Sequence, residues 1–440
     1  MRMMAAVLAA GLAATAVTAQ DVVPPAPLTD RDFRQIDEAE ARLGWLLFYD
    51  PILSGNREVA CATCHHPAFA TGDGVSLGIG DGGRGLGPDR DVDPANPPEQ
   101  RIPRNAPPLF NVGLYPVLFH DGRIERDPTK PGGIRTPLGQ DMVAGFASLL
   151  SAQTMFPVLS ADEMAGHYTE NEIARAVRQG LITGEDGAWT LIADRVAAIP
   201  AYAEAFARVY PHIDGPEDIA FTDISNAIAT FMEWEWRSDA SAFDAWTRGE
   251  APLPEEARAG AALFYGEAGC GGCHAGPLLT DFAYHAMGAP QIGPGKAARF
   301  ERHARDEGRF RVTGREEDLY AFRTPSLRNV TETGPWGHAG AHDDLGAFIA
   351  AHADPAAGLA AWTPDEAVLP EMEVDDLWAR RTPGEWEAIA AAVLRPATPL
   401  TAAQIDDLLA FLETLDDPVA LDGRFGVPET VPSGLPVPRP

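Results

Sequence analysis

The sequence contains one five-residue pattern twice, as Cys-Ala-Thr-Cys-His at residues 61–65 and as Cys-Gly-Gly-Cys-His at residues 270–274. Two cysteines three residues apart and a histidine directly after them are typical of c-type haem attachment. The two thiols add across the haem vinyl groups, and the histidine ligates the iron. The predicted attachment residues are Cys61, Cys64 and His65 in the first copy and Cys270, Cys273 and His274 in the second. The chain is therefore predicted to hold two covalent haems.

The two copies use all four cysteines of the 440-residue chain, so none is left for a disulfide. The alternative for each copy is a zinc site or a redox-active dithiol. Neither copy has a second cysteine or histidine pair at the spacing of a zinc site, and a dithiol motif needs no histidine after it. The pattern therefore favours haem attachment over both alternatives.

Residues 1–19 have the layout of a cleaved secretory signal peptide. Arg2 precedes an apolar run that ends in Val-Thr-Ala at residues 17–19. No later stretch has the roughly 20 apolar residues that span a bilayer, so we expect a mature protein that does not cross the membrane. Export and haem attachment both predict a periplasmic location.

The charge of the chain limits its partners. The sequence has 34 basic and 64 acidic residues, a net charge of −30. This charge argues against nucleic acid as a partner and favours a cationic one, because a charged surface steers association. An acidic surface that serves only solubility explains the same charge equally well.

An internal repeat precedes each haem motif. Residues 40–49 and 256–265 share the pattern Glu-Ala-Arg-x-Gly-x-x-Leu-Phe-Tyr. Two copies of one helix-then-haem unit predict two domains of one kind, at residues 20–250 and 251–426. The proline-rich tail at residues 427–440 is expected to wrap the surface or to be disordered.

Local patterns predict the remaining elements. Apolar residues recur at helical spacing through residues 170–248, which predicts helices that bury one face. Residues 72–108 are rich in Gly, Pro and Asp, which predicts a long ordered loop. Thr401 and Gln404 form a capping box at the start of a last helix.

Four further segments connect the sequence to a known family. They are residues 104–111 (Arg-Asn-Ala-Pro-Pro-Leu-Phe-Asn), 119–123 (Phe-His-Asp-Gly-Arg), 157–164 and 324–329 (Thr-Pro-Ser-Leu-Arg-Asn). These four segments and the two haem motifs occur in the order that is typical of the bacterial dihaem cytochrome c peroxidase and MauG family. The mature chain resembles that family over nearly its whole length. The resemblance implies a mostly α-helical fold of two cytochrome c-like domains, each with one c-type haem, and a calcium ion between them.

The resemblance also implies that peroxide reacts at the first haem. In the family a glutamine, a proline and a glutamate line the distal side of that haem, and Gln153, Pro157 and Glu163 match them. Cleaving peroxide requires a proton to move from one oxygen to the other, which a carboxylate in a sparsely hydrated pocket can achieve near neutral pH. Glu163 is therefore the expected general acid and base. The alternative is a solvated glutamate that caps the next helix.

At the second haem, His352 matches a position that methionine occupies in peroxidases of the family. We expect His352 to be the second axial ligand there, with a lower haem potential than a methionine ligand gives. Met287 is the competing ligand, because it lies closer in sequence to His274. A third reading makes His352 a surface residue beside Asp354.

His120 stands where better-known family members have a tryptophan between the haems, which places any electron route through that tryptophan in doubt. His120 either shortens the electron path or hydrogen-bonds a haem propionate; position between two sites does not decide between these roles.

Calcium in the family is bound by an asparagine, by two backbone carbonyls and by water. Asn105, Thr333 and Pro335 match those positions, and oxygen-only ligation suits this hard cation. The alternative role of Asn105 is to hold a loop in place.

The loop after the first motif bears on whether the first haem is open at rest. Family members that need reductive activation have a distal histidine in this loop. Between His66 and His120 the sequence has no histidine, methionine or lysine, and Asp81, near the missing histidine, is a weak ligand for ferric haem. We therefore expect no need for reductive activation. The alternative is that His120 or a rearranged His66 fills the site.

The expected function is a periplasmic dihaem cytochrome c peroxidase. It would reduce hydrogen peroxide to water with electrons from a small donor protein such as a basic cytochrome c or a cupredoxin. The first alternative is a MauG-like oxidase that uses high-valent iron to oxidise a protein or a small molecule. The second is a non-catalytic dihaem electron carrier or peroxide sensor, which would have no need of the Gln153, Pro157 and Glu163 pocket.

Overall fold

The structure, a computed structural model, describes residues 22–139, 142–296, 301 and 303–440. The signal peptide expected at residues 1–19 lies outside the described residues. The described chain is mostly helical, as predicted, with three small antiparallel sheets.

The helices are α1 (Glu38–Tyr49), α2 (Cys61–Cys64), α3 (Leu149–Thr154), α4 (Glu172–Gln179), α5 (Ala188–Ala197), α6 (Pro200–Val209), α7 (Phe221–Glu235), α8 (Ala242–Thr247), α9 (Glu255–Tyr265), α10 (Phe310–Thr313), α11 (Leu345–Ala353), α12 (Pro355–Ala361), α13 (Trp378–Arg381), α14 (Glu385–Ala391), α15 (Ala402–Glu413) and α16 (Pro418–Asp422). The strands pair as β1 (Gly83–Arg84) with β2 (Asp91–Val92), as β3 (Val117–Leu118) with β4 (Ile124–Arg126) and β5 (Ile134–Arg135), and as β6 (Tyr284–His285) with β7 (Phe322–Arg323).

The two copies of the sequence repeat form α1 and α9, and each packs closely against a later helix. A Cβ atom on Gly44 of α1 would lie 1.8 Å from the Ala227 carbonyl oxygen of α7. A Cβ atom on Gly260 of α9 would lie 1.8 Å from the Asp407 carbonyl oxygen of α15. The repeated glycine therefore lets two helix backbones approach each other in the same way in both halves of the chain.

The starts of these helices follow from capping. The Asp37 side chain accepts a hydrogen bond from the Ala39 N–H at the start of α1 (2.8 Å). At the start of α15, Thr401 and Gln404 each accept a hydrogen bond from the backbone N–H of the other (3.3 and 2.9 Å). The predicted capping box is confirmed, and it satisfies two N–H groups that the helix leaves without partners.

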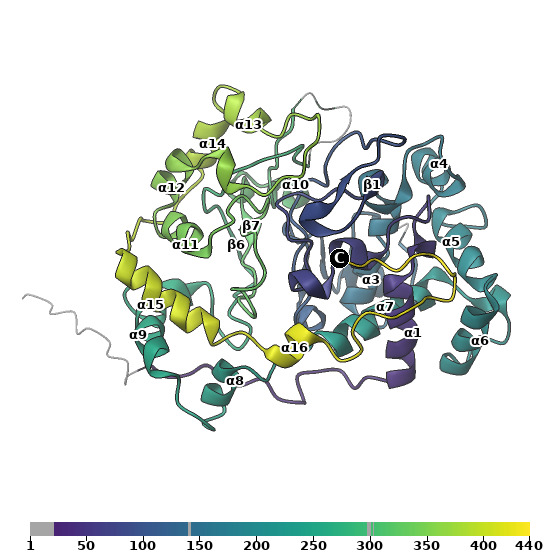
Figure 1. Cartoon of the computed structure of the whole chain (residues 1–440), viewed down its shortest axis with the longest axis horizontal. Helices are drawn as coiled ribbons and strands as arrows, with labels where there is room; N and C mark the ends of the chain where they lie inside the picture. Colours follow the sequence, from purple (N-terminus) through teal and green to yellow (C-terminus); the bar gives the residue numbers. More distant parts are fainter. Residues whose placement is uncertain (1–21, 140–141, 297–300, 302) are drawn as a thin grey trace, which may run out of the picture.

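Two main apolar cores accompany the two helix pairs. The larger core contains Leu47, Phe48 and Phe231 from α1 and α7, and the smaller contains Phe264 and Phe411 from α9 and α15. In Figure 1 the first helix pair lies on the right and the second on the left. Each haem motif follows the first helix of its pair in sequence, at residues 61–65 after α1 and at residues 270–274 after α9.

The end of the chain returns from the second half to the first (Figure 1). After α15, Ala420 and Val431 are buried in the larger core. The Ser433 hydroxyl donates to the Asp50 carboxylate (2.6 Å), and Trp45 donates its indole N–H to the Gly426 carbonyl (2.7 Å). Residues 418–437 thus pack against the first half, although the sequence places them after the second.

Buried ion pairs join the two halves. The Arg104 guanidinium donates to both carboxylate oxygens of Asp306 (2.7 Å each) and lies 2.8 Å from Asp121. All three side chains are at most 5% exposed. Separating the loop before α10 from the first half would leave one of these buried charges without its partner, which costs about 3–5 kcal/mol. The triad therefore holds the loop against the first half.

Among the described residues, every helix is too short or too polar to cross a bilayer.

Candidate haem sites

The residues of the first motif line a cavity in the first half of the chain. Cys61 and Cys64 lie on α2 and, with His65 directly after it, line about 1350 Å³ of empty space that is partly continuous with solvent. The His65 Nδ1–H donates to the Thr71 carbonyl oxygen (2.9 Å). This bond fixes the ring orientation and leaves Nε2 as the free, unprotonated nitrogen, which is how a metal-binding histidine is held.

The second motif repeats this arrangement. Cys270, Cys273 and His274 line a cavity with about 1980 Å³ of empty space, also partly continuous with solvent. The His274 Nδ1–H donates to the Leu279 carbonyl oxygen (3.0 Å). Thr71 and Leu279, the two acceptors, both have left-handed backbones, with φ of 68° and 49°. Residues other than glycine rarely adopt this backbone conformation. Its presence at both sites indicates that the two histidines are held by the same local backbone structure.

His352 lies across the second cavity from His274. It comes from α11, and its ring centroid lies 6.4 Å from that of His274. A metal–imidazole bond of about 2 Å on each side accounts for most of this separation, so the gap suits one iron between two rings. Burial lowers the pKa of His352 to about 3, which keeps the ring neutral and able to ligate. Met287 lines the same cavity.

The three predicted distal residues share the first cavity. Gln153 comes from α3, Pro157 begins a short 3-10 helix (Pro157–Leu159), and Glu163 lies in a turn of π-helix (Ala161–Ala165). All three line the same space as His65. Glu163 is half-buried, so the reading of it as a fully solvated capping residue does not fit its position.

The glycine-rich loop after the first motif supports Glu163. A Cβ atom on Gly80 would lie 2.2 Å from the Asp162 carbonyl oxygen and 2.6 Å from that of Glu163. Buried Arg90 holds this loop from inside, with Nη2 donating to the Gly80 carbonyl (2.6 Å) and Nη1 to that of Gly85 (2.8 Å). The loop backbone therefore sets where Glu163 lies.

Asp81 in this loop is buried and does not line the first cavity. Its two carboxylate oxygens accept from the Asn56 amide (3.1 Å each). Burial raises the pKa of Asp81 to about 6, and neighbouring Glu170 adds to the shift. The structure thus directs the Asp81 carboxylate toward Asn56 and leaves the first cavity clear of it.

The chain is similar to several known proteins. Residues 38–252 match the family model described as di-haem cytochrome c peroxidase. The chain is 29% identical over 308 residues to methylamine utilization protein MauG of Methylorubrum extorquens, covering 70% of this chain and 66% of that one. It is 27% identical over 317 residues to cytochrome c551 peroxidase of Pseudomonas aeruginosa, covering 72% of each.

Over residues 38–252 the chain belongs to the di-haem cytochrome c peroxidase and MauG family. The crystal structure of the diheme peroxidase BthA from Burkholderia thailandensis is also similar, with a TM-score of 0.57, 25% identity and coverage of 92% of this chain and 91% of that chain. Membership implies two c-type haems, and the two cavities with their cysteines, histidines and size fit them.

His120 lines both candidate haem cavities. Its Nε2–H donates to the Asn105 carbonyl oxygen (3.1 Å), and its own carbonyl accepts from the Arg323 N–H (2.8 Å). Burial lowers the pKa of His120 to about 3, so the ring is neutral. Tyr115 and Arg323 also line both cavities, so they share this position between the haem sites.

The three residues matched to calcium ligands all line the second cavity. The Asn105 Nδ2 donates to the Val75 carbonyl (2.9 Å), which does hold the loop after the first motif. No hydrogen bond to Asn105 Oδ1 is found within the described part of the chain. Thr333 and Pro335 flank a bend that contains a cis peptide bond before Pro335. The calcium assignment stays a prediction.

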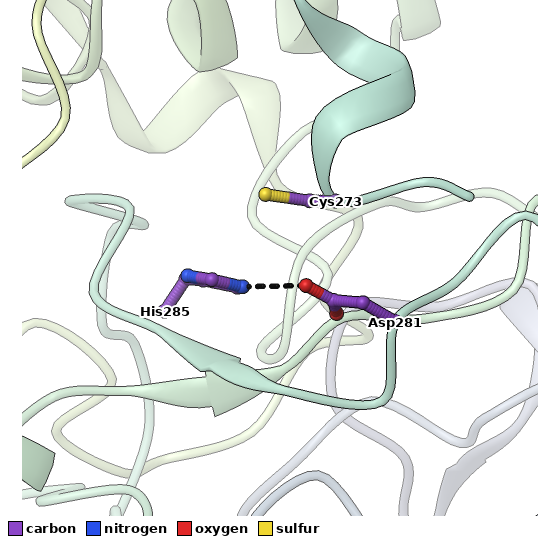
Figure 2. A group of neighbouring side chains, drawn as sticks. All are labelled: Cys273, Asp281 and His285. Atoms are coloured by element: carbon purple, nitrogen blue, oxygen red, sulfur yellow. Dashed lines mark hydrogen bonds and ion pairs between the residues drawn. The ribbon is translucent and has the colours of Figure 1, made fainter.

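Cys273, Asp281 and His285 place three potential metal ligands within 4.8 Å of one another (Figure 2). His285 Nε2 lies 3.1 Å from the Asp281 carboxylate, and both side chains are partly exposed. A thioether at Cys273 would remove its thiolate, leaving only two ligands. The group is therefore better described as a surface ion pair beside the second attachment site.

Two residues of the first cavity were not predicted from the sequence. Lys296 comes from the second half of the chain yet lines the first cavity with Glu163. The one sequence signal for it is the rarity of lysine, because the chain has just two lysines, at positions 130 and 296. Asp73 is a buried carboxyl in the same cavity, and burial raises its pKa to about 7.

Proposed function

We propose that this protein is a periplasmic di-haem peroxidase that reduces hydrogen peroxide to water, with two electrons and two protons, in the first cavity. The observation that carries the proposal is the difference between the cavities. Opposite His274 lies a second histidine, His352, whereas the space around His65 contains Glu163, Gln153 and Pro157. One cavity is arranged to hold a ligand-saturated iron, and the other is arranged to admit a small molecule.

Cys61, Cys64 and His65 would hold the first haem, and Cys270, Cys273, His274 and His352 the second. When bound, each haem supplies a redox-active iron. The backbone bonds of the two proximal histidines keep Nε2 available, and burial lowers the pKa of both rings so that they stay neutral.

Glu163 is the group that would move the proton. A carboxylate can accept a proton from one oxygen of hydrogen peroxide, here called the inner oxygen, and return it to the other, the outer oxygen. The outer oxygen then carries two protons and leaves as water when the O–O bond breaks. The Gln153 amide can donate a hydrogen bond to a bound oxygen. Pro157 has no N–H to attract water, so it helps to keep the cavity dry.

Electrons would enter at the second site and cross to the first. The second attachment lies beside a partly exposed ion pair, where a donor can approach. The net charge of −30 favours a basic donor such as a cytochrome c, with a cupredoxin as another suitable carrier. His120 lies between the cavities, held at its ring and its backbone, so it can define a fixed path. Calcium at Asn105, Thr333 and Pro335 would hold the same region rigid.

A MauG-like oxidase is the second candidate, and His352 is the observation that favours it. A histidine ligand keeps the potential of the second haem lower than a methionine ligand does. A lower potential makes electron withdrawal from this haem easier, as an oxidase that stores two oxidising equivalents requires. The relatives include proteins of both names.

The deciding experiment compares steady-state peroxide turnover, with reduced cytochrome c as donor, against the absorption spectrum of the diferric protein after one equivalent of peroxide. Fast turnover and rapid return of the resting spectrum support the peroxidase. Slow turnover with a long-lived spectral change supports the oxidase. No turnover and no spectral change would leave only the electron carrier.

A further inference from the structure

Lys296 is the unusual residue of the first cavity. The chain uses arginine for nearly all of its 34 basic residues and has lysine only at positions 130 and 296. Lys130 is exposed, whereas Lys296 lines the cavity that contains His65 and Glu163. A lysine is a compact point charge with three donors, which an arginine fork does not reproduce.

A loop of the second half carries Lys296 into the first half. Ile292 packs against Leu77 in a shared buried cluster, and Gly293 closely approaches the Leu77 side chain. The Lys296 N–H donates to the Arg305 carbonyl (3.1 Å), next to Asp306 of the buried triad. These contacts fix the base of the side chain, so the first cavity is incomplete without the second half.

The arginines that face Lys296 are already paired with carboxylates. Arg104 lies against Asp306 and Asp121, and Arg123 donates to Asp121 (2.9 Å) while its guanidinium stacks over Phe119. No ion pair or hydrogen bond of the Lys296 ammonium is found among the described residues. The half-buried Lys296 ammonium therefore lies in the cavity with hydrogen-bond donors that no described residue takes up.

Burial lowers the pKa of Lys296 to about 8, with Arg123 and Arg104 acting in the same direction and Glu163 and Asp121 opposing them. The side chain is therefore mostly protonated at pH 7. Two other titratable groups that line the cavity, Asp73 and His120, have pKa values of about 7 and about 3.

We propose that Lys296 is the anion-binding group of the first haem cavity, placed there to hold a small anionic ligand such as hydroperoxide beside Glu163. The inference rests on the proposed function in that it takes the first cavity as the peroxide site. An O–H bond of hydrogen peroxide breaks, its proton goes to the Glu163 carboxylate, and its electron pair stays on the resulting hydroperoxide. The ammonium stabilises that negative charge, and Glu163 still carries the proton for the outer oxygen.

Azide tests this role without any turnover. Azide would be titrated into the diferric holoprotein and followed by absorption for the wild type, Lys296→Met, Lys296→Gln and Lys296→Arg, with Lys130→Met as the control for a lost lysine elsewhere. We expect Lys296→Met and Lys296→Gln to weaken azide binding by at least tenfold and Lys296→Arg to recover part of it. Nitric oxide, a neutral ligand, should bind all variants within about threefold.

The pH profile adds a second readout. Wild-type azide affinity should fall as pH rises through about 8, because Lys296 loses its proton, and this step should be absent in Lys296→Met. A step near 7 that remains in the variant belongs to Asp73.

Equal azide affinity in wild type and Lys296→Met, or the same pH step in both, would overturn the inference, since the lysine would then only pair with a haem propionate or support the loop. Tighter azide binding by Lys296→Met would also overturn it, because the lysine would then block the iron. If azide binding depends on Lys296 but peroxide is not turned over, the proposed function fails and the anion site stands. If peroxide is turned over but azide binding does not depend on Lys296, the proposed function stands and the anion site fails.

Discussion

Around His65 and around His274 the chain builds the same structure twice. Each histidine follows a helix whose glycine packs against a later helix, and each donates Nδ1–H to the carbonyl of a residue with left-handed backbone, Thr71 or Leu279. Such backbone costs on the order of 1–3 kcal/mol, so its repetition indicates that ring orientation matters equally at both sites.

The side chains that face the two proximal histidines across the cavities differ. The second receives His352 from α11, at 6.4 Å between ring centroids. The first receives Gln153, Pro157 and Glu163 from residues 149–165 and Lys296 from the other half. The repeated part of the sequence thus positions each cofactor, and the unrepeated segments decide what each cofactor can meet.

The strongest test of the repeat is haem stoichiometry. Cys270→Ser with Cys273→Ser should remove one covalent haem of two, and Cys61→Ser with Cys64→Ser should remove the other, because each thiol pair attaches its own haem. The measurement is the mass of the denatured protein. Wild-type protein without any haem adduct would refute the haem assignment at both sites.

The next test addresses the difference between the cavities. Glu163→Gln keeps the shape of the side chain but removes its proton carrier, so peroxide turnover should fall by about two to four orders of magnitude. Asp162→Asn is the matched control, because Asp162 binds Gln100 (2.7 Å) and does not line the cavity. A loss of less than threefold in Glu163→Gln would show that this carboxylate is not the catalyst.

Spin state sharpens the same difference. The oxidised wild type should show one high-spin and one low-spin ferric haem by electron paramagnetic resonance, and it should bind cyanide without prior reduction, because the Asp81 carboxylate does not line the first cavity. His352→Ala should convert the low-spin signal to high-spin, and His352→Met should raise that haem's potential.

Met287→Ala is the control for this assignment, since Met287 lines the same cavity. A spin change in Met287→Ala with none in His352→Ala would make Met287 the ligand. Two low-spin haems at rest, with a lag that a reductant removes, would contradict the open first cavity.

How far the sequence predicts this molecule depends on how local each signal is. The haem motifs, the repeat and the Thr401 capping box lie within a few residues of one another in sequence, and the structure places them as that spacing indicates. The gathering of Gln153, Pro157 and Glu163 beside His65 followed from family resemblance, because no periodicity links residues 149–165 to residue 65.

Long-range contacts lay beyond sequence reasoning. Lys296 reaches the first cavity through packing of Ile292 on Leu77, and the tail returns to the first half through Val431 and Ser433. Neither segment has helical or strand periodicity that would indicate a partner. The family resemblance places Asp81 near the missing histidine, but it does not indicate that the Asp81 carboxylate accepts hydrogen bonds from Asn56.

The last test asks whether close packing at the repeated glycine contributes equally to the free energy of unfolding in the α1–α7 pair and in the α9–α15 pair. Gly44→Ala and Gly260→Ala each add a methyl group that would lie 1.8 Å from a facing carbonyl oxygen, so the helices of that pair must move apart. Overpacking of this kind costs about 1–3 kcal/mol in the free energy of unfolding. Denaturant unfolding followed by far-ultraviolet circular dichroism, which reports helix content, would measure this loss in each variant. Similar losses in both variants would extend the equivalence of the two units to their packing. A loss in one variant alone would mean that the other helix pair can separate at little cost, and that the two halves share a pattern without sharing its energetic role.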